Sequence, residues 1–111
     1  MKRRFRLRAY CYDSKGRLIS TGENNYGKSH PLQAYWAKSV GQEERIYLHA
    51  EIHAILRAKD REIFSIKVER FDNQGKPVLS YPCPVCRAAI KAFGIKQICF
   101  TTPDGIAIQK L

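Results

Sequence analysis

Two short segments contain side chains that suit metal-assisted hydrolysis. One holds His49 and Glu51, an imidazole and a carboxylate, and the other holds Cys83 and Cys86, two thiols. A catalytic zinc ion takes three protein ligands of these nitrogen and sulfur types and leaves a fourth position for water. Together the two segments offer a candidate zinc site with a carboxylate near it.

The two cysteines are expected at the start of a helix. Cys83 and Cys86 are spaced i, i+3, which places both thiols on one face of a helix. Pro84 suits the first helical turn, where a missing N–H costs little. Because that end of a helix has positive partial charge, it lowers the pKa of a thiol and favours the metal-binding thiolate.

The spacing of His49 and Glu51 sets a stricter condition on the other segment. Residues i and i+2 of a helix point about 200° apart, so both reach one site only if the helix meets it end-on. The sequence therefore predicts a helix that begins at His49 and ends near 59–61, with both residues in its first turn. His53 would lie one turn deeper, which favours a core or hydrogen-bonding role over metal ligation.

The order His49-Ala50-Glu51, then Pro82-Cys83 and Cys86, resembles the zinc-dependent cytidine deaminase superfamily. Members of that superfamily act on free nucleosides, nucleotides, tRNA and single-stranded DNA. The resemblance covers most of the chain and implies zinc held by His49, Cys83 and Cys86. It also implies hydrolytic deamination with Glu51 as general acid and base, cytosine being the preferred base and adenine the second.

The resemblance further suggests residues that contact the substrate. Many relatives place an Asn just after the second strand; Asn24 fits that spacing, Asn25 is an alternative, and a turn role is equally open for both. His30 could touch a phosphate or base at the rim of the pocket, or could simply begin a helix. We assign substrate binding to Asn24, His30, Ala50 and Pro82.

Hydrophobic periodicity predicts the elements that position these residues. Strands are expected over 2–12, 17–22, 62–71, 96–102 and 106–109, helices over 30–38, 49–60 and 84–93, and a polar loop over 22–27. Ile90 and Phe93 should be buried, and the helix over 30–38 should lie near the sheet. The turn at 103–105 is too short for a parallel crossover, so the last strand should be antiparallel. These elements predict one α/β domain over 1–111 with a mixed sheet of about five strands, and the resemblance implies a three-layer α/β/α cytidine deaminase-like fold.

The chain is strongly basic, with 20 Lys and Arg against 10 Asp and Glu and a net charge of +10. This excess favours a phosphate-bearing substrate, either single-stranded nucleic acid or a dCMP-type nucleotide, although a solvated surface would show the same charge. The predicted antiparallel last strand argues against what the charge favours, because this topology resembles the free-cytidine deaminase branch and some deaminase toxins. The rival function is a non-catalytic nucleic-acid-binding protein with a structural zinc, for which Glu51 would be dispensable.

Location and assembly are read from what the sequence contains. No signal peptide and no apolar run of membrane-spanning length is seen, which favours a cytoplasmic protein. In a reducing compartment Cys83 and Cys86 are better used on metal than in a disulfide, while Cys11 and Cys99 sit in apolar strand-like runs. A sheet edge left exposed in so small a domain makes a homo-oligomer possible.

Overall fold

The computed structural model describes residues 7–41 and 47–111, without the side chains of 25–29 and 47–48. Helices and strands alternate along most of this length. In chain order they are β1 (Leu7–Tyr12), β2 (Leu18–Glu23), β3 (Asn25–Ser29), α1 (Pro31–Ser39), β4 (Tyr47–Leu48), α2 (Ala50–Ala58), β5 (Ser65–Arg70), α3 (Pro84–Ala92), β6 (Gln97–Thr102) and β7 (Gly105–Lys110). The part of the predicted first strand that falls in residues 1–6 lies outside the described residues.

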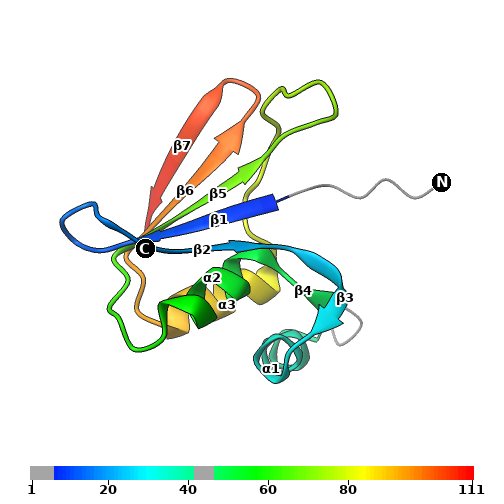
Figure 1. The fold of residues 1–111 in the computed structure, drawn as a ribbon, viewed down its shortest axis with the longest axis vertical. Coiled ribbons are helices and arrows are strands. Elements are labelled where there is room, and N and C mark those ends of the chain that lie inside the picture. Colours follow the sequence, from blue (N-terminus) through cyan, green and yellow to red (C-terminus); the bar gives the residue numbers. More distant parts are fainter. Residues whose placement is uncertain (1–6, 42–46) are drawn as a thin grey trace.

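The main sheet has five strands in the order β2-β1-β5-β6-β7 (Figure 1). Strand β1 is antiparallel to both β2 and β5, β5 and β6 are parallel, and β7 is antiparallel to β6. The parallel pair is joined through α3, as a parallel connection requires a long crossover, whereas β6 and β7 are joined by a tight turn. The predicted α/β class, mixed sheet and antiparallel last strand are confirmed.

The core lies on one face of this sheet. Side chains alternate along a strand, so Ala9 and Cys11 of β1 and Ile66 and Val68 of β5 all face the helices and are buried. Figure 1 shows α2 and α3 next to each other along this face. A second apolar cluster fills the space between the helices, and its buried members are Ala37, Ile52, Val85, Cys86 and Ala89.

The three layers are stacked in an order that the sequence did not indicate. Helix α1 was expected near the sheet. It instead packs against α3 and contributes Ala37 to the cluster between the helices. The layers are therefore the sheet, the pair α2 and α3, and then α1. Within the described ranges, none of the helices is long and apolar enough to cross a membrane.

Two local expectations were wrong. The predicted polar loop over 22–27 contains the end of β2 and most of β3, which pairs with β4 about twenty residues later in the chain. That pairing is long-range and leaves no local pattern. Phe93 is 47% exposed, because the helix ends before it and Phe93 is the C-cap, whereas Ile90 is fully buried as predicted.

Helix α2 and strand β2 touch backbone to backbone at Gly22. A Cβ atom at Gly22 would lie 2.4 Å from the amide nitrogen of Ala54 and 2.5 Å from the carbonyl oxygen of Ala50. The Ser20 hydroxyl donates a hydrogen bond of 2.7 Å to the carbonyl of Ala54, which fixes the same contact. The small residues of α2 thus face a strand position that only glycine can occupy, and this contact sets the depth of α2 on the sheet.

Replacing Gly22 with alanine should therefore destabilise the fold strongly. A rigid backbone neighbour cannot move aside as a flexible side chain would, and overpacking of this kind costs about 3 kcal/mol. Gly75→Ala is the matched control, since Gly75 has open space around it and only its φ of +77° to strain, a cost of about 1 kcal/mol. Urea unfolding measures both variants, and equal losses would show that the contact at Gly22 is not tight.

Candidate metal centre

Two helix starts meet at the candidate site. His49 is the N-cap residue of α2 and Cys83 is the N-cap residue of α3, and both have extended backbones. Neither side chain makes a capping hydrogen bond to its own helix. Pro84 occupies the first turn of α3, as the sequence predicted, and Cys86 follows within that turn. The two helices therefore meet this site with their positively polarised ends.

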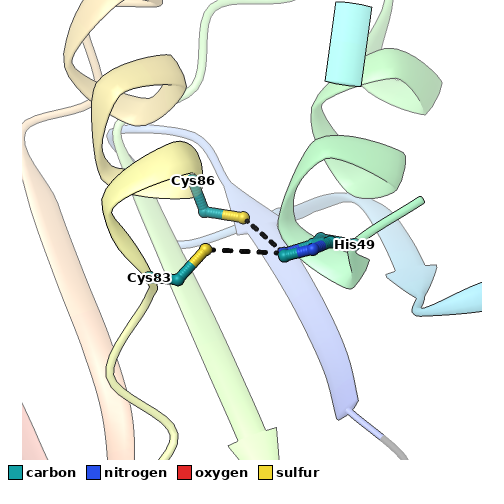
Figure 2. A group of neighbouring side chains, drawn as sticks. All are labelled: His49, Cys83 and Cys86. Atoms are coloured by element: carbon teal, nitrogen blue, oxygen red, sulfur yellow. Dashed lines mark hydrogen bonds between the residues drawn. The ribbon is translucent and has the colours of Figure 1, made fainter. Parts of the chain in front are cut away.

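His49, Cys83 and Cys86 point toward one another in Figure 2. The Nδ1 atom of His49 lies 3.5 Å from Sγ of Cys83 and 3.3 Å from Sγ of Cys86. The three ligand-type atoms all lie within 4.8 Å of one another. Cys86 is fully buried and His49 is 7% exposed, while Cys83 is partly exposed. Of the three side chains, Cys83 is thus the most exposed to solvent.

The size and donor set of this cluster fit zinc. Tetrahedral zinc with bonds of about 2.0–2.3 Å to nitrogen and sulfur separates its ligand atoms by about 3.5 Å. The two nitrogen–sulfur distances of 3.5 and 3.3 Å are close to that separation. One imidazole and two thiols supply three ligands, the number found in catalytic zinc sites. Among the described residues, no other group of three or more His, Cys, Asp or Glu side chains is close enough to hold a metal.

Glu51 lies in the first turn of α2 and is only 3% exposed. Burial raises the pKa of its carboxyl group, while the imidazole of His49 and hydrogen bonding with Cys86 act in the opposite direction. The angular problem between His49 and Glu51 is solved differently from the prediction. His49 is the extended residue that directly precedes the helix and is not part of it. The helical rotation of about 100° per residue therefore does not set the angle between the side chains of His49 and Glu51.

The two thiols differ sharply in acidity. Hydrogen bonding from Cys86 is the largest cause that lowers the pKa of Cys83, to about 4, and the His49 imidazole adds to it. The pKa of Cys86 is raised well above its usual value, first by its hydrogen bond to Cys83 and then by burial. In the metal-free protein at neutral pH, Cys83 is therefore the thiolate and Cys86 holds the proton between them.

Alkylation of the metal-free protein should show this acidity. With a pKa of about 4, Cys83 keeps its thiolate as the pH falls from 8 to 5 and loses it only below that range. Iodoacetamide should therefore modify Cys83 at a nearly constant rate down to pH 5, and zinc should block the reaction. Peptide mass spectrometry measures this, with the partly buried Cys99 as the internal control. A Cys83 rate that falls tenfold per pH unit from pH 8 downward would contradict the assignment.

A buried polar network fixes the segment that leads to Cys83. The Ser80 hydroxyl donates to the carbonyl of Val68 at 2.7 Å and accepts from the Thr101 amide at 2.7 Å. The Thr101 hydroxyl donates to the carbonyl of Val78 at 2.7 Å. Ser80 and Thr101 are each 3% exposed, so these bonds are sheltered from water. They attach the chain before Pro82 to β5 and β6 and so limit where the thiols can stand.

The predicted substrate contacts divide into two groups. Ala50 and Pro82 are buried next to His49 and Cys83 in the chain. Asn24 ties two strands together, since its Oδ1 accepts the Leu7 amide at 3.0 Å, and its contact with substrate stays a prediction. His30 caps α1, its Nδ1 accepting from the Leu32 amide at 3.0 Å, which is the helix-start role left open above. The side chain of Asn25 lies outside the described residues.

His53 takes the hydrogen-bonding role that its spacing predicted. Its Nδ1 lies 3.1 Å from the amide nitrogen and 3.2 Å from the carbonyl oxygen of Glu23, at the end of β2. The metal-ligand cluster does not include it. His53 therefore connects α2 to the sheet.

Sequence reasoning missed Gln33, a buried polar residue of α1. Its side-chain oxygen accepts the backbone N–H of His49 at 3.2 Å, although Gln33 is fully buried. The local sequence gives only the pattern of an amphipathic helix, in which one glutamine is unremarkable. Nothing in it indicates that this side chain reaches a segment sixteen residues further along the chain.

An aromatic side chain with a cation over it stands just before the thiols. The ring of Tyr81 packs edge-on against Phe100 at 5.1 Å, and the guanidinium of Arg87 lies 5.2 Å from the Tyr81 ring centre. The Tyr81 hydroxyl donates to Gln109 at 2.8 Å. Arg87 is exposed and directly follows Cys86. A positive charge is thus held over the aromatic ring that shortly precedes the thiols in the chain.

Comparison with known proteins bears on this site directly. Residues 2–102 match the family described as the cytidine and deoxycytidylate deaminase zinc-binding region. A search of the curated proteins finds no match. The matched range contains both helix starts and every residue of the cluster.

Proposed function

Because this chain belongs to the cytidine and deoxycytidylate deaminase family, we propose that it is a zinc-dependent hydrolytic deaminase that converts cytosine to uracil in a phosphate-bearing substrate. The observation that supports this best is the convergence of the His49 imidazole and the thiols of Cys83 and Cys86, with Glu51 buried beside them. We assign the three converging side chains as zinc ligands. Glu51 is the general acid and base.

Each step of the reaction can be given to a residue of this chain. Zinc held by the three ligands would lower the pKa of water and so supply a nucleophile near neutral pH. Glu51 would take one proton from the attacking water and give it to the ring nitrogen, and would then take the second proton from the new hydroxyl group on the ring carbon and give it to the departing amine. One C–O bond forms, one C–N bond breaks, and water is consumed as ammonia leaves. The raised pKa of Glu51 suits a group that must hold a proton between these steps.

Two observations support a substrate that bears phosphate. The net charge of +10 favours anionic ligands in general. Arg87 gives that preference a local form, because it is exposed one residue after Cys86 and is held over Tyr81. A guanidinium placed there can pair with a phosphate while the base lies at the zinc. We further place the enzyme in the cytoplasm, where reducing conditions keep Cys83 and Cys86 as thiols, the state in which all four cysteines are found.

Mass spectrometry on a mixed substrate pool tests this proposal. Zinc-loaded protein is incubated with dCMP, cytidine and a mixed-sequence single-stranded oligonucleotide, and Glu51→Gln is run in parallel. Conversion of dCMP or of the oligonucleotide above cytidine supports phosphate recognition, and loss of the oligonucleotide reaction at high salt would identify a polymer substrate. Preferred conversion of cytidine would contradict the phosphate assignment. Absence of any conversion would leave adenine substrates or a structural zinc as the explanation of the site.

A further inference from the structure

We propose that Gln33 is a positioning residue for the metal centre and sets where the imidazole of His49 stands. Its side-chain oxygen accepts the backbone N–H of His49 at 3.2 Å in a buried contact between α1 and the start of α2. Gln33 is fully buried and His49 is 7% exposed. The proposal uses the proposed function only in taking His49, Cys83 and Cys86 as ligands.

The backbone of His49 is held at both of its polar groups. As the N-cap residue, His49 has its N–H outside the helical hydrogen-bond ladder, so a buried N–H at this position needs another acceptor. Gln33 supplies that acceptor. The carbonyl of His49 in turn accepts a hydrogen bond of 3.0 Å from the amide of His53. With both groups fixed, the direction of the Cα–Cβ bond is fixed, and so is the starting point of the imidazole.

Gln33 also links the histidine to the helix that holds the cysteines. Helix α1 packs against α3, and Ala37 of α1 lies in one buried cluster with Cys86. The start of α1 is set by the His30 cap and by Pro31 at its first position, which places Gln33 within the first turn. Helix α1 therefore contacts both α3, which contains the thiols, and the backbone of His49. Through these two contacts it sets the position of the imidazole relative to the thiols.

The chemistry at position 33 requires an acceptor of a certain length. Methionine has nearly the same volume as glutamine but offers no oxygen, so it would remove the hydrogen bond that the buried His49 N–H makes to position 33. Glutamate keeps an acceptor at the same reach. Asparagine keeps the amide but is one methylene shorter. Outer partners of metal ligands commonly change metal affinity by about 10–100-fold when they are removed.

Cobalt binding tests the proposal without any use of catalysis. Metal-free wild type, Gln33→Met, Gln33→Glu and Gln33→Asn are titrated with Co²⁺, and the thiolate-to-cobalt absorption band is recorded with the dissociation constant. Leu32→Ala is the matched control, because it loosens the packing of the same helix but leaves the acceptor in place. Gln33→Met is expected to bind Co²⁺ at least about tenfold more weakly and with a shifted band. The Co²⁺ affinity and absorption band of Gln33→Glu should lie closer to those of wild type, and Leu32→Ala should bind Co²⁺ as wild type does.

Two results would overturn the proposal. Gln33→Met with wild-type affinity and an unshifted band would make Gln33 a packing residue only, and so would an equal loss in Leu32→Ala. If Gln33→Met does not fold, Gln33→Asn decides, since its acceptor falls short of the His49 amide and should give the same weakened, shifted binding. A wild-type protein that binds Co²⁺ through its thiolates but deaminates nothing would defeat the proposed function and leave the role of Gln33 standing.

Discussion

Replacing Glu51 with glutamine is expected to lower deamination by about a thousandfold while zinc stays bound, because general acid–base groups contribute on this scale and Glu51 is not among the ligand atoms. Glutamine has the shape of the carboxylate but cannot accept the proton from water. Burial raises the pKa of Glu51, so the charged form is disfavoured in the metal-free fold at neutral pH. A neutral amide should therefore keep or raise the melting temperature.

The measurement pairs turnover with zinc content and thermal unfolding. Glu69→Gln is the control, because Glu69 is a partly buried carboxylate of β5 that pairs with Lys67 at 3.6 Å and alternates away from the core-facing side chains. It should retain both activity and zinc. Full activity in Glu51→Gln would remove Glu51 from the mechanism, and loss of zinc in that variant would show that its carboxylate helps to hold the metal.

Cys86→Ser is expected to abolish zinc binding and the stability that zinc provides. Cys86 is fully buried, and its Sγ lies 3.3 Å from Nδ1 of His49, so no exposed side chain can replace it. Zinc at a thousandfold excess over its dissociation constant stabilises a protein by about 4 kcal/mol, or about 15 °C in Tm for a domain of this size. Adding zinc to metal-free wild type should raise Tm by that amount, and Cys86→Ser should not respond.

Cys99→Ser is the control for this experiment. Cys99 is a partly buried, free cysteine on β6 and does not belong to the metal-ligand cluster. Its variant should show the same zinc-dependent rise in Tm as wild type. A normal rise in Cys86→Ser would exclude this thiol as a ligand, whereas a lost rise in Cys99→Ser would show that zinc acts elsewhere on the chain.

The residues that could be found from the sequence are those whose signal is local. The spacing of Cys83 and Cys86 with Pro84 between them specifies a helix start, and α3 begins there. The helix start predicted at His49 is also found, because α2 begins at Ala50 directly after it. The length of the turn at 103–105 was enough to predict that β7 is antiparallel to β6.

What the sequence did not reveal depends on contacts between distant segments. The pairing of β3 with β4, the packing of α1 on α3 and the bond from Gln33 to His49 each join parts of the chain that have no common pattern. Asn24 makes a contact of the same kind, because its Oδ1 accepts the Leu7 amide. Its role in substrate binding stays a prediction.

The most direct test of a hydrolytic zinc deaminase is the fate of oxygen from water. Zinc-loaded wild type and Glu51→Gln are incubated with dCMP and a single-stranded oligonucleotide in heavy-oxygen water, and the products are examined by mass spectrometry. We predict that the new ring carbonyl made by wild type contains the heavy oxygen and that Glu51→Gln makes almost none. Zinc-loaded wild type that yields no labelled uracil product from either substrate would contradict the cytosine deaminase assignment.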